Sequence, residues 1–260
     1  MFTRLLSIVL PIAFAAGSAY AQDSLGIQGL QASLSYGMAD DGQTVGSGQV
    51  KLDVDITQVH GLQLDLGLID GGKALTGQLG AHLYMRPVQN QKYGFFASIS
   101  DMDGEAIQYL SVGGEGRIGL SDQLALDLHL GIGGTTGMGG TSANQWDYVF
   151  AGGGLLFAKS DATTLEARVD IAEFDELTFR AIGVDSSLRV SHRLNASNFA
   201  VFGEARHSAL YGTDAQSPIT TFQIGVTMDL GRSSQTLMDR PFETPNPFEQ
   251  LVQRGIVMSF

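Results

Sequence analysis

The alternation of apolar and polar residues restricts the fold of this chain more than any other feature of its sequence. In the stretch QVKLDVDITQVHGLQLDLGL, residues 49–68, every even position from Leu62 to Leu68 is leucine, and Gln63 and Asp65 lie between them. At about 100° per residue, a helix would distribute these leucines over opposite sides, whereas a strand places them on one face. We therefore expect residues 49–68 to form a hairpin with one aliphatic face and one polar face.

The same alternation continues along most of the chain and predicts about twelve strands. Their expected ranges are 26–37, 47–57, 60–69, 74–86, 92–101, 106–120, 123–133, 145–157, 163–172, 176–193, 199–210 and 219–230. A change of parity near Gly183 indicates a bulge in the tenth of these strands. Three connections after odd-numbered strands are long, whereas those after even-numbered strands are all short, which is typical of an up-and-down meander through a membrane.

The first 21 residues have the layout of a secretory signal peptide. Arg4 precedes an apolar run, and small residues ending in Ala-Tyr-Ala lead to a cleavage site before Gln22. A transmembrane anchor is the weaker alternative, because it needs roughly 20 apolar residues. We expect three parts, namely a signal peptide over residues 1–21, a barrel over 22–231 and a tail over 232–260.

Charge and cysteine content exclude several classes of function. After removal of a leader that contains Arg4, the 15 basic residues become 14 against 27 acidic ones, and the net charge becomes −13. Nucleic acid is therefore not an expected partner, because phosphate binding requires clustered lysine and arginine. The chain has no cysteine, which excludes disulfides and thiolate metal sites. Its histidines lack the spacing of a metal site, so we expect neither a metal nor a cofactor.

The leader, the acidic charge, the lack of cysteine and the strand pattern together resemble Gram-negative outer-membrane β-barrel proteins, over about residues 24–230. Members of that porin-like superfamily share a closing strand of the form polar-x-Gly-x-x-apolar-x-apolar. Both QIGVTMDL, Gln223–Leu230, and QRGIVMSF, Gln253–Phe260, match this form. The resemblance implies export to the cell outer membrane, contact with outer-membrane lipid and lipopolysaccharide, and insertion by the barrel-assembly machinery.

The predicted fold is all-β, a closed up-and-down antiparallel transmembrane β-barrel of about twelve strands. A soluble lipocalin-like barrel is the alternative, and its aliphatic faces would point inward. In nearly every strand, however, charge is concentrated on one face and almost absent from the other. Lipid outside and a watery lumen inside explain that asymmetry.

Two segments compete to close the barrel. Residues 222–230 are apolar at every even position, whereas only Ile256, Met258 and Phe260 alternate at the end of the chain. We therefore expect closure at Leu230 and an even number of strands, which returns the tail to the periplasm.

The tail contains the signals of one short helix. Asn246 is placed as its cap, Pro247 at its first position, Glu249 in its first turn and Gly255 after its end. We expect this helix near the mouth of the lumen. A disordered linker is the alternative, because three prolines interrupt the segment.

The polar faces of the strands predict which residues line the lumen. Simple turn centres set three complementary pairs opposite each other, which are Arg117 with Asp127, Glu115 with His129, and Arg189 with Glu204. Such pairs stabilise the wall of a barrel. The complete set of predicted lumen residues is Lys51, Asp53, Asp55, Asp65, Glu115, Arg117, Asp127, His129, Glu166, Arg168, Arg189 and Glu204.

The first long hairpin predicts a concentration of negative charge. A turn centred on Val59 sets Asp53 opposite Asp65, with Lys51 and Asp55 nearby. Two facing carboxylates repel each other unless a cation or the lysine compensates them. A patch that attracts cations is the functional interpretation, and ordinary solvation by lumen water is the alternative.

The predicted function is passive, either a small pore or a structural membrane protein, with a polar, acidic lumen that favours cations. We expect no enzyme. A lipid-modifying hydrolase would depend on His207 and Ser208, but neighbours on a strand face opposite sides, and the chain has no Gly-x-Ser-x-Gly motif. The third possibility is a surface-binding or adhesion protein that uses Trp146, Tyr148 and the glycine-rich loop 133–144, although such aromatic residues also suit anchors at the lipid interface.

Overall fold

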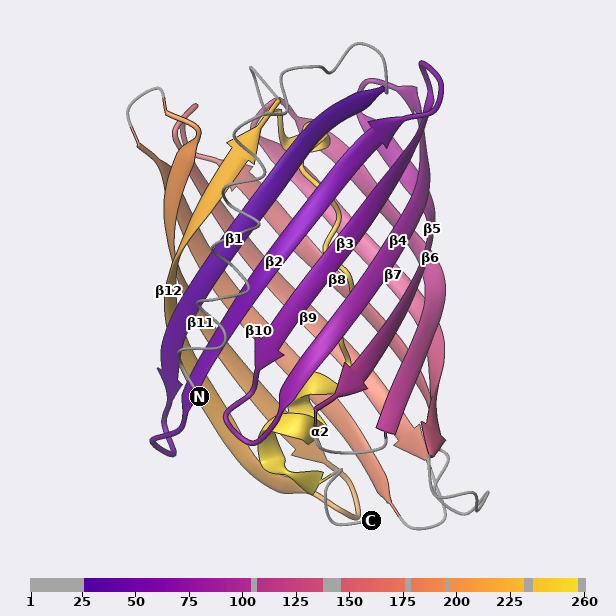
Figure 1. Ribbon diagram of the computed structural model, residues 1–260, viewed down its shortest axis with the longest axis vertical. Helices are drawn as coiled ribbons and strands as arrows, with labels where there is room; N and C mark the ends of the chain where they lie inside the picture. Colours follow the sequence, from indigo (N-terminus) through magenta and orange to yellow (C-terminus); the bar gives the residue numbers. More distant parts are fainter. Residues whose placement is uncertain are drawn as a thin grey trace.

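Twelve antiparallel strands form a closed barrel in the computed structural model (Figure 1). The structure describes residues 26–103, 107–137, 146–175, 179–194, 197–231 and 236–256. The strands are β1 (Ile27–Ala39), β2 (Thr44–Asp55), β3 (His60–Asp70), β4 (Leu75–Val88), β5 (Gln91–Met102), β6 (Ile107–Ser121), β7 (Leu124–Gly137), β8 (Asp147–Ala158), β9 (Thr163–Asp175), β10 (Arg180–Arg193), β11 (Phe199–Tyr211) and β12 (Gln216–Leu230). The predicted fold class and all twelve predicted strands are confirmed.

The barrel closes at Leu230, as predicted. Each strand pairs with its neighbour in sequence, and β1 pairs with β12 so that Leu30 lies opposite Leu230. The competing segment does not begin as a strand, because Gln253 and Arg254 belong to helix α2 (Glu249–Arg254). Its last residues, 257–260, lie outside the described part of the chain.

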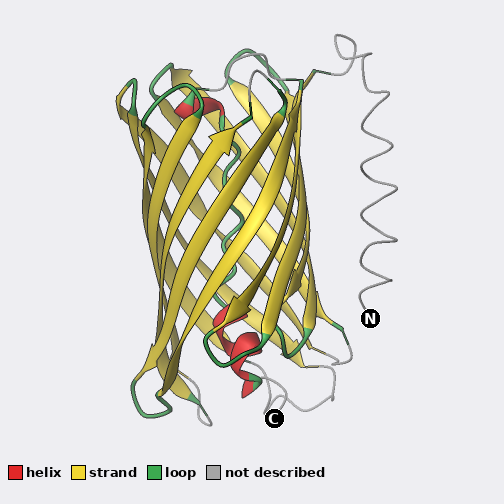
Figure 2. Ribbon diagram, turned by 90° about the vertical axis from the view of Figure 1, so that its left-hand side faces the viewer, coloured by secondary structure: helices red, strands yellow, loops and turns green. Residues whose placement is uncertain are grey.

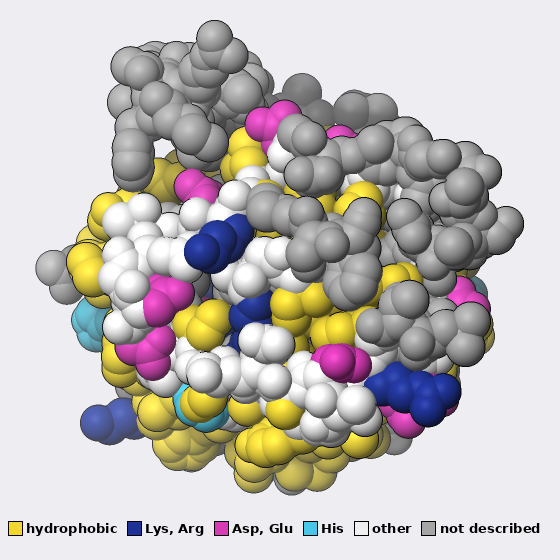
Figure 3. Space-filling model, turned by 90° about the horizontal axis from the view of Figure 1, so that it is seen from below, with side chains coloured by type: hydrophobic (Ala, Val, Ile, Leu, Met, Phe, Trp, Pro, Cys, Tyr) yellow, Lys and Arg dark blue, Asp and Glu magenta, His cyan; other side chains and the backbone are white. Residues whose placement is uncertain are grey.

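The two faces of the barrel wall have opposite character. In β3, Leu64 and Leu66 point outward and are 43% and 47% exposed, whereas Gln63 and Asp65 point inward and are 0% and 8% exposed. Large apolar side chains are exposed on the outer face of most strands, and they gather at the lower rim of the barrel when it is seen from one end (Figure 3). An apolar exterior around a polar interior is the pattern of a barrel surrounded by lipid.

Residues 236–256 run through the interior of the barrel from one end to the other (Figures 1 and 2). They begin with the 3-10 helix η3 (Leu237–Asp239) at the end where β1 starts and β12 finishes, which we call the terminal end. They continue as an extended segment and finish in α2 at the opposite, distal end. The expectation of a periplasmic tail is therefore corrected, because polar side chains of the inner wall bind this segment within the barrel.

The predicted short helix is present, with a different start. Helix α2 begins at Glu249 after Phe248, and no side chain caps it, so Asn246 is not its cap. Gly255 ends it in the left-handed conformation, with a φ of 70°, as predicted. Burial of Leu251 and Val252 stabilises this single turn and a half in place of a cap. No described helix is long and apolar enough to cross a membrane.

The predicted bulge at Gly183 is absent. Strand β10 pairs with β9 and with β11 without a register shift at this position. The change of parity has another cause, because the inward-facing residues Phe179 and Ala181 pack in the apolar cluster that contains Phe248. Gly183 itself faces the side chain of Gln250, and a Cβ atom there would overlap it. The change of parity near Gly183 therefore results from inward-facing residues of β10 and the preceding loop that contact the tail.

Candidate functional site

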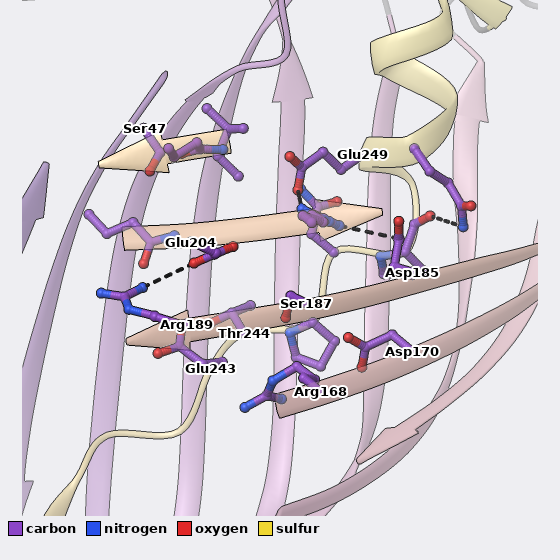
Figure 4. A pocket seen from close by; sticks show the side chains of 18 of the residues that line it. Ser47, Arg168, Asp170, Asp185, Ser187, Arg189, Glu204, Glu243, Thr244 and Glu249 are labelled. Atoms are coloured by element: carbon purple, nitrogen blue, oxygen red, sulfur yellow. Dashed lines mark hydrogen bonds and ion pairs between the residues drawn. The ribbon is translucent and has the colours of Figure 1, made fainter. Parts of the chain in front are cut away.

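The inner wall carries the predicted lumen residues, apart from Asp55, whose side chain is exposed at the terminal end. Two of the three predicted cross-strand pairs form ion pairs. Arg117 donates to both carboxylate oxygens of Asp127, at 2.5 and 2.7 Å. Arg189 Nη1 lies 3.5 Å from Glu204 Oε2 (Figure 4).

The third predicted pair is correct in register, but the two side chains contact other residues. Glu115 lies opposite His129 in the β6–β7 pairing. The Glu115 carboxylate is nevertheless 2.9 Å from His82 Nδ1, and His129 Nε2 is 3.2 Å from Asp170 Oδ1. Cross-strand register therefore predicted correctly which residues lie opposite each other here, but not which side chains form the ion pairs.

The predicted register of the first long hairpin is wrong. Lys51 lies opposite Asp65, and Asp53 lies opposite Gln63, because the turn is centred one residue earlier than Val59. Asp53 and Asp65 therefore do not face each other, and Lys51 lies directly opposite Asp65. Among the described residues, no group of three or more histidine or carboxylate side chains is placed to hold a metal ion.

Arg117 holds the start of the tail at the terminal end. Its side chain is 1% exposed. Besides the pair with Asp127, its Nη1 atom donates to the carbonyl oxygens of Leu237 and Arg240, at 2.9 and 2.8 Å. Backbone carbonyls that enter a lumen lose water, and a buried guanidinium with several donors replaces it.

The middle of the tail is bound through the backbone of Phe242. The Gln63 side chain accepts from Phe242 N at 2.8 Å and donates to Phe242 O at 2.9 Å. Lys51 Nζ donates to the same carbonyl oxygen at 2.8 Å and lies 2.6 Å from Glu243 Oε2. The fully buried side-chain amide of Gln63 thus pairs with the Phe242 backbone as a residue of a neighbouring strand would, and this fixes the position of the tail along the barrel axis.

The ring of Phe242 lies between cations. Lys92 Nζ is 4.3 Å from the ring centroid, and the guanidinium carbon of Arg117 is 5.4 Å from it. The His82 ring stacks on it with centroids 6.1 Å apart. Cation–π contacts of this kind are worth about 2 kcal/mol when water is excluded.

Two residues after Phe242, Thr244 joins a buried polar network. Its hydroxyl donates to Asp65 Oδ2 at 2.7 Å and lies 3.0 Å from His82 Nε2. His82 also lies 3.3 Å from Asp65 and 2.9 Å from Glu115. The network links the tail to three wall strands, β3, β4 and β6.

The distal end of the lumen is apolar, unlike the rest. Five inward-facing residues surround the Phe248 ring, and we call them the aromatic cup: Tyr109, Trp146, Tyr148, Phe174 and Phe179. The Tyr109 and Phe248 rings stack with centroids 4.8 Å apart. Trp146 and Tyr148 are 4% and 2% exposed, so their predicted roles as surface contacts or lipid anchors are wrong. The loop residues 138–145 lie outside the described part of the chain.

Arginine side chains hold the helix beside the cup. Arg206 donates to Glu249 Oε2 at 2.9 Å and to Asp185 Oδ2 at 3.2 Å. Arg254 donates to the Ser208 hydroxyl at 3.0 Å and to the Ser208 carbonyl oxygen at 2.7 Å. The helix is therefore fixed at both of its ends.

The tail does not fill the lumen. A cavity of about 200 Å³ lies between the second half of the tail and the wall, and a second one of about 390 Å³ lies toward the terminal end. Both cavities are lined by Glu166, Arg168, Arg189 and Glu243, so they meet at this group of charges. Figure 4 shows Arg168, Arg189 and Glu243 in the smaller cavity. The described lumen thus contains polar space on both sides of this group of charges, beside the tail.

Comparisons with known proteins identify the fold and no closer relationship. No family model matches the chain, and no curated protein matches it. Among solved structures, it is similar to the KdgM porin (9% identity, TM-score 0.53, 76% of this chain and 98% of that chain). It is also similar to the NanC porin (6%, 0.60, 76% and 98%) and to the COG4313 outer membrane channel from Pseudomonas putida F1 (12%, 0.58, 82% and 98%). The chain therefore has the fold of Gram-negative outer-membrane β-barrel proteins.

Proposed function

We propose, from an outer-membrane β-barrel fold with a tail inside it, that this protein is a narrow pore for small hydrophilic solutes and that its C-terminal tail holds the pore largely closed. The observation that carries this proposal is the pair of polar cavities that meet beside the tail. Polar space along a lumen can hold water and small hydrophilic solutes, whereas a lumen filled by side chains excludes them. The porin and channel folds among its structural neighbours support the same direction.

The proposed orientation follows from the positions of the chain ends. Export by a signal peptide over residues 1–21 would leave the terminal end in the periplasm, and the distal end with helix α2 would face the outside of the cell. Outer-membrane lipid and lipopolysaccharide would then contact the apolar exterior, and the barrel-assembly machinery would insert it.

The charge of the lumen favours cations. The lining of the smaller cavity carries three arginines and seven Asp and Glu residues, two of which belong to the tail. A low-dielectric channel with excess negative charge concentrates cations and repels anions. Several of these carboxylates are paired with arginine, so we expect a preference for cations and not strict selectivity.

Planar-bilayer recording of the purified protein tests the pore. The complete protein should show small, infrequent conductance steps, and a chain that ends at Ser233 should show larger and longer ones. Heat-modifiable migration of the shortened chain serves as the control for folding. A shortened protein that is folded and inserted but electrically silent would contradict the proposal and favour a structural role.

A hydrolase has less support from the geometry. Ser208 is 2% exposed, faces the lumen and accepts a hydrogen bond from Arg254. His207 faces the other side of β11 and contacts Thr220. We therefore propose no enzymatic activity, and lipid hydrolysis that disappears in His207→Ala would overturn this view.

A further inference from the structure

The aromatic cup belongs to the larger of the two apolar clusters among the described residues, in a lumen that binds the middle of the tail mainly through charges, amides and cation–π contacts. The Phe248 ring at its centre is fully buried and lies 4.8 Å from Tyr109, 5.8 Å from Tyr148 and 6.0 Å from Trp146, between ring centroids. Rings at these separations pack favourably in stacked and tilted arrangements. The wall therefore provides a site shaped for one aromatic ring.

A carboxylate site adjoins the ring site. Glu249 directly follows Phe248, and its carboxylate accepts from Arg206 Nη1 at 2.9 Å. Arg206 also binds the wall residue Asp185, which orients the guanidinium toward the lumen. Arginine beside an apolar cup recognises a ring and a carboxylate a few bonds apart.

The present occupant is fixed at both ends of its helix but leaves two of its own polar atoms without partners. Helix α2 has six residues, and a helix of this length does not persist without its packing. Gln250 Oε1 and Arg254 Nε are buried and have no hydrogen-bond partner among the described residues. Each such group costs free energy when the helix is docked and regains water when it leaves. Binding of the helix is thus open to competition.

A solute can reach the same groups through the lumen. Arg206, Glu249 and Gln250 line the smaller cavity. A solute carboxylate in that cavity can take the place of Glu249 at Arg206, which exchanges one negative charge for another, and its ring then lies beside the cup.

We propose that the aromatic cup and Arg206 form a binding site for small aryl carboxylates, which Phe248 and Glu249 of the tail occupy in their absence. The proposal rests on the proposed pore function, because displacement of the tail by such a ligand would open that pore. It concerns binding, however, and does not require conduction.

Trp146 provides the measurement, because it is the only tryptophan of the chain and lies 6.0 Å from Phe248. We would add 3-phenylpropionate to the folded protein in detergent and follow tryptophan fluorescence. A saturable change is expected with 3-phenylpropionate, and none with propionate or with 3-phenylpropanol at the same concentrations. Equal responses to all three compounds would overturn the proposal.

Three variants make the test specific. Phe248→Ala empties the cup, so the affinity for 3-phenylpropionate should rise about tenfold or more as competition is removed. Arg206→Gln should weaken binding about tenfold or more. Arg189→Gln, in the same lumen but paired with Glu204, is the matched control and should leave binding unchanged. No saturable response in folded Phe248→Ala protein, or equal affinities for the two arginine variants, would refute the site.

The two proposals fail separately. Binding with silent bilayers would retain the site and remove the pore, whereas conductance of the shortened chain without fluorescence changes would retain the pore and remove the site.

Discussion

The Gln63 side chain should determine how firmly the tail stays in the barrel. Replacement of Gln63 by leucine keeps the volume nearly constant and removes both hydrogen bonds to the Phe242 backbone, of 2.8 and 2.9 Å. The carbonyl oxygen retains Lys51 as a donor at 2.8 Å. Phe242 N has no other hydrogen bond in the described structure, so it becomes a buried donor without a partner.

The expected cost follows from these groups. Two lost hydrogen bonds and one unsatisfied N–H weaken docking of the tail by about 2–4 kcal/mol, which raises the released fraction roughly 30- to 700-fold. The contacts of Gln63 with Asp65 lie within the wall. Their loss affects docked and released states alike and cancels in the difference.

Cleavage by chymotrypsin after Phe242 reports the release, because a protease cannot enter the lumen. The peptide that begins at Glu243 is quantified by mass spectrometry, and its rate of formation follows the released fraction when redocking is fast. Gln78→Leu is the matched control, since Gln78 is buried in the same wall and its Nε2 atom has no hydrogen-bond partner among the described residues. Equal cleavage rates in the two variants would refute this account of tail docking.

Three further predictions concern topology, the lipid face and close packing. An epitope attached after Phe260 should be labelled by antibody on intact cells. An epitope placed directly after residue 22 should be labelled only after the cells are permeabilised. If both epitopes were labelled only after permeabilisation, the proposed orientation would be wrong. Leu79→Arg, on the outer face of β4 and 57% exposed, should lower the free energy of unfolding in lipid vesicles by about 2–4 kcal/mol, whereas Val88→Arg at the end of the same strand should cost about 1 kcal/mol or less. Equal costs in urea titrations would argue against a lipid-embedded middle. Gly225→Ala should lower the free energy of unfolding by about 1–3 kcal/mol, because a Cβ atom there would overlap the Phe202 ring and the Leu34 carbonyl oxygen. Gly203→Ala is the control and should leave the free energy of unfolding unchanged, since nothing lies within 4 Å of a Cβ atom there. Unchanged unfolding curves for both variants would show that the atoms around Gly225 move to accommodate the methyl group.

The strands were predictable because their signal is local. Alternation with period two and glycine-rich turns specify where a strand lies and which face meets lipid, and neither depends on distant residues. Register in the first hairpin was not predictable to one residue, since the turn after Asp55 closes with Ile56 N bonded to His60 O and not around Val59. A shift of one residue in a turn centre moves every cross-strand partner by two.

The tail could not be placed from its own sequence. Its prolines and mixed polarity suit a linker as well as an extended segment bound inside a barrel. The informative signal lay elsewhere, in apolar residues such as Phe174 and Phe179 on a face that should be polar, and in the parity change near Gly183. An apolar patch inside a polar lumen requires an apolar partner from the same chain or from a ligand. Three residues that contact the tail were not predicted from the sequence, namely Gln63, Lys92 and Arg206. Their only signal in the sequence is an inward-facing position in the alternating pattern, which they share with many other polar residues.

Five consecutive strands each contribute at least one side chain to residues 240–244 of the tail: Lys51 of β2, Gln63 and Asp65 of β3, His82 of β4, Lys92 of β5 and Arg117 of β6. A closed ring of strands leaves this segment only two routes to its place. It can be drawn lengthwise through the terminal end after β1 and β12 have paired, which requires Phe248 to pass the whole polar interior. Alternatively, the tail can bind the inner face of the curved sheet while β1 and β12 are still apart. The barrel then closes around it when these two strands pair.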